Sequence, residues 1–124
     1  MKKIYCLSTC STCNQILDDI QAKKKGFILQ DIKTEKITPA QLDELKQQVG
    51  SYEALFSRRA LKYKEMGLKD QDLKEKDYRR LILEEYTFLK RPVVVVGRHF
   101  FVGSEKKTVS SLKAFLLSTP PAAE

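Results

Sequence analysis

The sequence predicts an α/β sandwich in which helices pack on a mixed four-stranded sheet. A strand–helix–strand pattern occupies about the first thirty residues, and two apolar runs near the C-terminus are joined at Gly97-Arg98. A strand–helix–strand unit is right-handed with parallel strands, whereas two strands joined by a tight turn are antiparallel. The two ends of the chain together therefore predict a sheet that contains both kinds of pairing.

The first part of the chain supplies the strand–helix–strand pattern. An apolar strand is expected at residues 3–7, where a Ser/Thr cluster ends it. Apolar residues then recur at helical spacing, which predicts a helix from about residue 11 to residue 25. Gly26 is typical of the residue that follows a helix, and a second strand is expected at residues 27–32.

The middle of the chain is expected to form a helical insert over about residues 38–88. Its start is well marked, because Thr38 can cap a helix, Pro39 suits the first helical position, and Gln41 can complete a capping box. Helical segments are predicted at residues 39–49, 52–56, 59–66 and 74–85.

The last part of the chain completes the sheet. Four valines at residues 93–96 are typical of a strand buried on both faces, and a final helix is expected at residues 104–117. This order of elements is that of a thioredoxin-like α/β sandwich with a helical insert. We expect one domain over residues 1–118 and a flexible tail over residues 119–124.

Charge and hydropathy narrow the functional classes. The net charge is +7, but the lysines are spread over several segments and no aromatic residues alternate with a basic stripe, so direct DNA binding is not expected. No apolar run approaches the roughly 18 residues that a membrane span needs. The apolar stretch after Met1-Lys2-Lys3 is too short for a signal-peptide core. We expect a cytoplasmic protein without membrane contact.

Two cysteines, Cys10 and Cys13, form a C-x-x-C where the first helix should begin. A zinc site would be two ligands short, and His99 alone cannot complete it, so no metal is expected. No cofactor is expected either. In a cytoplasmic protein a C-x-x-C beside a strand–helix–strand pattern indicates redox chemistry.

The position of each cysteine suggests its role. The N-terminus of a helix favours a thiolate at Cys10, and the hydroxyls of Ser11 and Thr12 can add hydrogen bonds. Cys13 lies one turn further on and is expected to be more buried, so Cys10 would attack a substrate and Cys13 would resolve the adduct. Cys6, in the middle of a strand, is expected to be a small apolar core residue.

Arg91-Pro92 precedes the valine strand and is a candidate cis peptide bond. Such a turn would bring Arg91 near the cysteine helix, where a guanidinium could hold an oxyanion or stabilise a thiolate. The alternative is that Arg91 is a surface residue in an ion pair.

Nearly the whole chain resembles the arsenate reductase (ArsC)/Spx family of glutaredoxin-like proteins. The resemblance lies in Ile4-Tyr5 before the Cys10 loop, in Phe56-Ser57-Arg58-Arg59, in Tyr63-Lys64-Glu65-Met66-Gly67-Leu68, in Leu89-Lys90-Arg91-Pro92-Val93-Val94-Val95, and in Val102-Gly103-Ser104. It implies a thioredoxin fold with a helical insert, a cis-proline at Pro92 that borders the substrate site, and a nucleophilic Cys10.

For arsenate reductases the resemblance implies three arginines that hold arsenate, with glutathione and glutaredoxin resolving the adduct. Arg91 matches one of these arginines, and Arg58 or Arg59 lies near the second. Val102 falls where the third would be, so one arsenate ligand is missing.

Spx-type transcription regulators instead carry a C-x-x-C redox switch and bind the RNA polymerase α subunit through a surface that includes a glycine matched by Gly50. On its residues alone Gly50 is a helix terminator. The first hypothesis is therefore a thiol–disulfide oxidoreductase that acts on arsenate or a disulfide, and the alternative is an Spx-like regulator. Glutathione could be a co-substrate of the first.

Overall fold

The computed structural model describes residues 1–118, so the tail predicted at residues 119–124 lies outside the described residues. The chain divides into two compact units. One unit, here called the sheet unit, combines Met1–Glu35 with the chain from Arg91 onward, and the other, the helical unit, is Lys36–Lys90. The assignment of the whole chain to a single domain stays a prediction.

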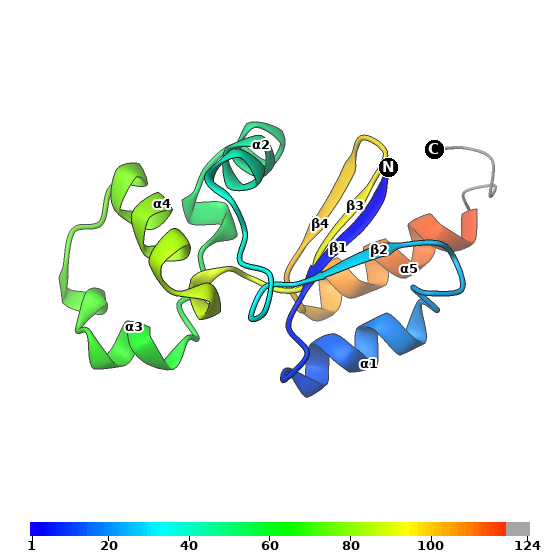
Figure 1. Ribbon diagram of the computed structural model, residues 1–124, viewed down its shortest axis with the longest axis horizontal. Coiled ribbons are helices and arrows are strands. Elements are labelled where there is room, and N and C mark those ends of the chain that lie inside the picture. The colour runs from blue at the N-terminus through cyan, green and yellow to red at the C-terminus, as the bar shows by residue number, and fades with distance from the viewer. Residues whose placement is uncertain (119–124) are drawn as a thin grey trace. The chain divides into compact units, whose positions relative to one another are not determined.

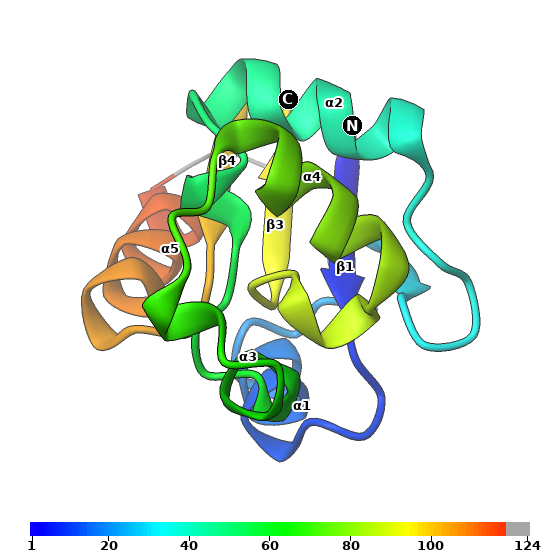
Figure 2. The same cartoon turned by 90° about the vertical axis from the view of Figure 1, so that its left-hand side faces the viewer.

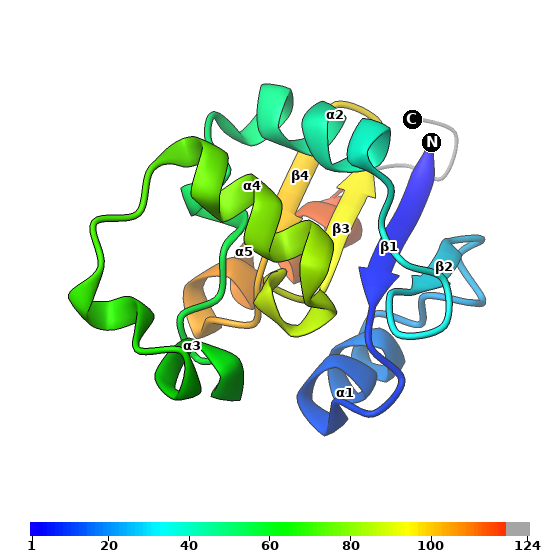
Figure 3. The ribbon, with the colours of Figure 1, turned by 60° about the vertical axis from the view of Figure 1, so that its left-hand side comes forward.

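The sheet unit contains all four strands, side by side in Figure 1. The strands are β1 (Lys2–Cys6), β2 (Ile28–Asp31), β3 (Val93–Val96) and β4 (His99–Val102), in the spatial order β2-β1-β3-β4. β1 pairs with β2 in parallel and with β3 antiparallel, as Figure 3 also shows for the neighbouring β1 and β3. β3 and β4 form an antiparallel hairpin. The predicted mixed four-stranded sheet is confirmed.

Two helices, α1 (Ser11–Asp19) and α5 (Lys106–Ser118), pack on one face of this sheet (Figure 1). Side chains alternate across a strand, so one face of β1 and one face of β3 meet the helices. The buried cluster on this face includes Ile4 and Cys6 of β1, Val94 and Val96 of β3, Cys13, Ile16 and Ile20 of the first helix region, and Leu112 of α5. Burial of this apolar surface holds α1, and with it the cysteine pair, on the sheet.

α1 ends at Asp19, six residues before the predicted end at residue 25. Gln21 adopts a left-handed conformation with φ of 54°, and its N–H donates to the carbonyl of Asp18. The N–H of Ala22 donates to the carbonyl of Leu17, which completes a Schellman motif. Glycine normally fills the left-handed position, so a glutamine there gave no recognisable stop signal. The lysines at 23–25 follow the helix instead of ending it.

The β3–β4 hairpin has a two-residue turn at Gly97-Arg98, with Val96 opposite His99. Gly97 has φ of 60°, a conformation that this turn requires and that glycine adopts without strain. All four valines of β3 are buried, as the apolar run predicts. α5 begins at Lys106, two residues after the predicted start.

The helical unit consists of helices and short 3-10 turns, seen from another side in Figure 2. Its elements are α2 (Pro39–Val49), η1 (Glu53–Leu55), α3 (Leu61–Glu65), η2 (Leu68–Asp70), α4 (Glu75–Glu84) and η3 (Tyr86–Phe88). The predicted capping box of α2 is present, because Thr38 Oγ1 accepts from the Gln41 N–H at 3.1 Å and Gln41 Oε1 accepts from the Thr38 N–H at 3.0 Å. Among residues 1–118, no helix is both long and apolar enough to cross a membrane.

The core of the helical unit is built around Phe56. Its ring stacks on Phe88 at 4.9 Å between centroids and also packs against Tyr63 and Tyr78. Aromatic clusters of this kind bury a large area per residue. The residues come from separate turns and helices, so the cluster ties the unit together.

A polar network joins α2 to α4 in the same unit. Asp43 accepts hydrogen bonds from the Arg79 guanidinium at 2.8 and 3.2 Å and from the Tyr52 hydroxyl at 2.6 Å. The hydrogen bonds from Arg79, and to a smaller extent that from Tyr52, lower the pKa of Asp43 from 3.8 to about 2. The hydrogen bond to Asp43 raises the pKa of Tyr52.

We expect Asp43→Asn to destabilise the protein at neutral pH. The pKa of Asp43 is lower in the folded state, so its stabilising effect is complete above about pH 4 and is lost as the pH falls from 3.8 toward about 2. The difference in unfolding free energy between wild type and variant should therefore shrink over that range in denaturant titrations. Glu44→Gln, an exposed change on the same helix, is the control. A difference between wild type and Asp43→Asn that does not change with pH would contradict this role.

Candidate active site

Cys10 is the N-cap residue of α1. Its backbone is extended, with φ of −96° and ψ of 109°, and its carbonyl accepts the first helical hydrogen bond, from the Asn14 N–H at 3.0 Å. No side chain caps this helix end. The first-turn N–H groups of α1 therefore have no partner from a capping side chain, and such a helix start is in general a favourable place for negative charge. Cys10 is half-buried and packs against the core of the sheet unit.

Hydrogen bonds hold the loop that leads from β1 to Cys10. The Cys10 N–H donates to the Leu7 carbonyl at 2.9 Å, and the Asn14 amide donates to the Ser8 carbonyl at 3.0 Å. Asp31 accepts from the Ser8 N–H at 3.3 Å, and its pKa is lowered, mainly by a side-chain hydrogen bond with Ser8. The loop is therefore fixed from both α1 and β2.

Sequence reasoning did not single out Asn14 and Asp31 as residues that hold this loop. A signal for Asp31 exists, because β1 and β2 were predicted to be parallel and their C-terminal ends lie at one edge of the sheet. In the structure Cys6 pairs with Asp31 at that edge. The polar residue that ends β2 could thus have been assigned to the cysteine loop.

Cys13 lies in the first turn of α1 and is fully buried, with an exposed fraction of 0%. Burial raises the pKa of its thiol, the charge of a neighbouring Cys10 thiolate raises it further, and a backbone hydrogen bond from Leu7 and the positive charge of Arg91 lower it in part. Cys13 therefore remains a protonated thiol at neutral pH, which suits a group that acts second.

Cys6 lies in β1, in the same buried cluster. Burial raises its pKa to about 11, and its thiol donates to the Gln30 carbonyl at 3.5 Å. Thiol reactivity requires the thiolate, so Cys6 is poorly suited to chemistry. Within residues 1–118, no group of three or more His, Cys, Asp or Glu side chains is placed to hold a metal ion.

The Arg91–Pro92 peptide bond is cis, which confirms the geometry predicted for this dipeptide. Pro92 is buried, and its carbonyl accepts from the Gly103 N–H at 2.9 Å. Arg91 is half-buried with its Nε enclosed, and its positive charge acts on Cys13. Thus the structure brings Arg91 and the cysteine pair together in the sheet unit. What Arg91 does there stays a prediction.

Arg58 and Arg59 lie in the helical unit, and their part in a site at Cys10 stays a prediction. The Arg58 guanidinium donates to Glu53 Oε2 at 2.7 Å and to the Tyr78 hydroxyl at 3.0 Å. Arg59 is exposed, and among the described residues no hydrogen bond or ion pair engages it. In the sheet unit, Val102 ends β4 at the position where the resemblance implies a third arginine.

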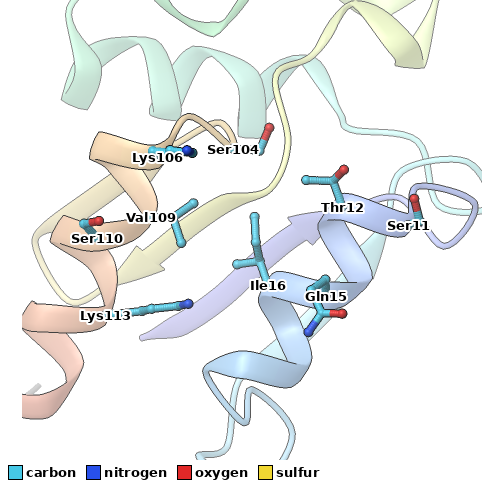
Figure 4. A pocket seen from close by; sticks show the side chains of 9 residues that line it. All are labelled: Ser11, Thr12, Gln15, Ile16, Ser104, Lys106, Val109, Ser110 and Lys113. Carbon is cyan, nitrogen blue, oxygen red and sulfur yellow. The ribbon is translucent and has the colours of Figure 1, made fainter.

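Ser11 and Thr12 are exposed on the first turn of α1 and face a groove between α1 and α5 (Figure 4). The groove has a volume of about 600 Å³. It is lined by Ser11, Thr12, Gln15 and Ile16 from α1, by Ser104, and by Lys106, Val109, Ser110 and Lys113 from α5. Two of the residues that line the groove, Ser11 and Thr12, directly follow the N-cap cysteine in the chain.

The fold and this loop define a thioredoxin-like protein with a C-x-x-C at the start of its first helix. The sequence profile of the ArsC family matches residues 5–112, and the chain belongs to that family. No curated protein matches the sequence.

Solved structures share the fold over most of the chain. The arsenate reductase of Vibrio cholerae is 21% identical, with a TM-score of 0.74 over 89% of this chain and 95% of that one. An arsenate reductase (ArsC) related protein of Brucella melitensis is 20% identical, with a TM-score of 0.68 over 89% of this chain and 92% of that one. A Staphylococcus aureus protein is 23% identical, with a TM-score of 0.71 over 90% and 97%.

The three cysteines should differ strongly in reactivity. With a pKa of about 11, about one Cys6 in ten thousand is a thiolate at pH 7. Cys13 is buried, and its pKa is also raised. Iodoacetamide should therefore modify Cys10 first by a wide margin in the native protein, as followed by peptide mass spectrometry at short reaction times. Equal modification of Cys10 and Cys6 would contradict the assignment, and protein unfolded in guanidinium is the control in which the difference should vanish.

Proposed function

We propose that this ArsC-family protein is a cytoplasmic thiol–disulfide oxidoreductase in which Cys10 is the nucleophile and Cys13 the resolving thiol. The observation that carries the proposal is the difference between two neighbouring thiols. Cys10 is half-buried at an uncapped helix N-terminus, whereas Cys13 is fully buried with a raised pKa.

The reaction proceeds in two exchanges. The Cys10 thiolate attacks one sulfur of a disulfide, the substrate S–S bond breaks, and one substrate thiolate leaves. Cys13 then loses its proton and attacks the Cys10 sulfur of the mixed disulfide, which releases the second substrate thiolate. The substrate gains two electrons, and the protein is left with a Cys10–Cys13 disulfide that an external thiol such as glutathione would reduce.

In this proposal Arg91 assists the second exchange. Its positive charge lowers the Cys13 pKa, opposing the effect of burial, and so makes the resolving thiolate easier to form. The cis-proline Pro92 borders the same region and would contact the substrate backbone.

A disulfide fits the site better than arsenate does. Arsenate is an oxyanion, and the resemblance implies that three arginines would hold it. In the described part of the sheet unit, Arg91 is the arginine whose charge acts on Cys13, and Val102 lies where the resemblance implies another arginine. In the helical unit, the Arg58 guanidinium donates to Glu53.

The experiment compares wild type, Cys10→Ser and Cys13→Ser in two assays. The first follows reduction of a protein disulfide with glutathione as reductant, and the second follows reduction of arsenate with glutathione and glutaredoxin. We expect Cys10→Ser to abolish turnover, with a fall of at least about a hundredfold, because the attacking sulfur is lost. Cys13→Ser should accumulate the mixed disulfide, detectable by mass.

Cys6→Ser is the matched control, and it should retain turnover. If Cys10→Ser kept the activity of wild type in both assays, the proposal would be wrong. Arsenate reduction that needs Cys10 but not Cys13 would replace the disulfide with arsenate as the substrate.

A second candidate is an Spx-like regulator that binds the RNA polymerase α subunit and senses redox state through Cys10 and Cys13. The observation that favours it is the environment of Gly50. This residue ends α2, is exposed, and has no atom within 4 Å of the position that a Cβ would take, so the surface around it is open.

If this candidate is correct, the purified protein binds the polymerase α subunit and Gly50→Arg abolishes binding. Gly50 has φ of 105°, which strains any other residue, so Gly50→Ala separates backbone strain from blockage of the surface and should retain binding. Biolayer interferometry measures the binding of wild type and of the two variants, each in oxidised and reduced form. Absence of binding in either redox state would exclude the regulator.

A further inference from the structure

The groove between α1 and α5 has the size and position of a substrate site. Its volume of about 600 Å³ lies within the range of small-molecule sites, roughly 300–1,000 Å³. Figure 4 shows side chains of both helices around it, with Ile16 and Val109 between the polar groups. Ser11 and Thr12, the residues that directly follow Cys10, are among the four residues of α1 that line it.

The polar groups of the groove favour an anionic ligand. Two ammonium groups, of Lys106 and Lys113, lie on the α5 side, and none of the described residues that line the groove carries a carboxylate. The hydroxyls of Ser11, Thr12 and Ser110 can donate hydrogen bonds to carboxylate oxygens.

The two lysines are not equivalent. Lys113 forms an ion pair with Asp19 of α1 at 3.3 Å, so its charge is partly neutralised. Among residues 1–118, no ion pair engages Lys106. Lys106 also lies at the start of α5, in the part of the groove that Ser104 lines. The uncompensated positive charge of the groove is therefore that of Lys106.

From these observations we propose that the groove selects disulfides that carry a carboxylate near the reacting sulfur, and that Lys106 is the specificity-determining residue. This inference rests on the proposed function, because the groove matters only if Cys10 attacks a disulfide. The carboxylate can belong to a small disulfide or to an acidic residue beside a cysteine of a peptide.

The chemical step is the first exchange already described. The Cys10 thiolate forms a bond to the near sulfur, the substrate S–S bond breaks, and the distant half leaves as a thiolate. The half that stays attached to Cys10 is the one that would lie along the groove. A carboxylate on this half would be held by Lys106 while Cys13 attacks.

The test uses the reduced full-length protein and three small disulfides that differ in charge. These are 3,3′-dithiodipropionate, which is anionic, 2-hydroxyethyl disulfide, which is neutral, and cystamine, which is cationic. Stopped-flow measurement of thiol release gives the rate constant for each in a single turnover, so no external reductant is needed. A second set of measurements distinguishes peptide substrates from small ones. It compares an acidic peptide that carries a mixed disulfide at its cysteine with the same peptide that has Gln in place of Glu.

We expect the anionic disulfide to react fastest and Lys106→Gln to slow it about threefold to fivefold. The same variant should react with the neutral disulfide at the same rate as wild type. Lys107→Gln is the matched control, because Lys107 is an exposed neighbour that does not line the groove and the change removes the same charge. It should react with all three disulfides as wild type does.

Two results would overturn the inference. One is an equal effect of Lys106→Gln and Lys107→Gln, which would indicate general attraction by the basic protein instead of selection by the groove. The other is equal rates for the three disulfides with wild type. Failure of the proposed function gives a result different from these two, because Cys10 would then react with none of the three disulfides.

Discussion

The site depends on one constraint, which is that Cys10 is the N-cap of α1 and lies only a short loop after β1. β1 and the apolar face of α1 share one core, so the start of the helix cannot move away from the end of the strand. The hydrogen bonds from Cys10 to Leu7, from Asn14 to Ser8 and from Ser8 to Asp31 then fix the short loop between them. Cys10 is thereby held as the N-cap of a helix whose first turn has no side-chain cap.

This arrangement gives the three thiols different surroundings within a single core. Cys10 is half-buried at the start of α1, whereas Cys13 and Cys6 are enclosed and have raised pKa values. The positive charge of Arg91 reaches Cys13 from the segment before β3. The proposed order of reaction, first Cys10 and then Cys13, rests on this difference in burial and position between two residues of the same type.

Much of the fold could be predicted from the sequence because its signals are local. The capping box at Thr38 and the two-residue turn at Gly97 depend only on residues that are neighbours in the sequence. The end of α1 was predicted wrongly, because Gln21 takes a left-handed conformation that glycine usually marks. Residues that hold the cysteine loop, above all Asp31, were missed because their role depends on strand register, and register is a tertiary property. The groove between α1 and α5 depends in the same way on how two distant helices pack.

The central claim is that Cys10 and Cys13 form the redox pair and that Cys6 does not take part. The most direct measurement oxidises the reduced protein with oxidised dithiothreitol and identifies the disulfide by mass spectrometry of non-reduced peptides. The account predicts one intramolecular bond, Cys10–Cys13, with Cys6 recovered as a free thiol. A disulfide that includes Cys6, or oxidation to dimers joined through Cys10 alone, would contradict it.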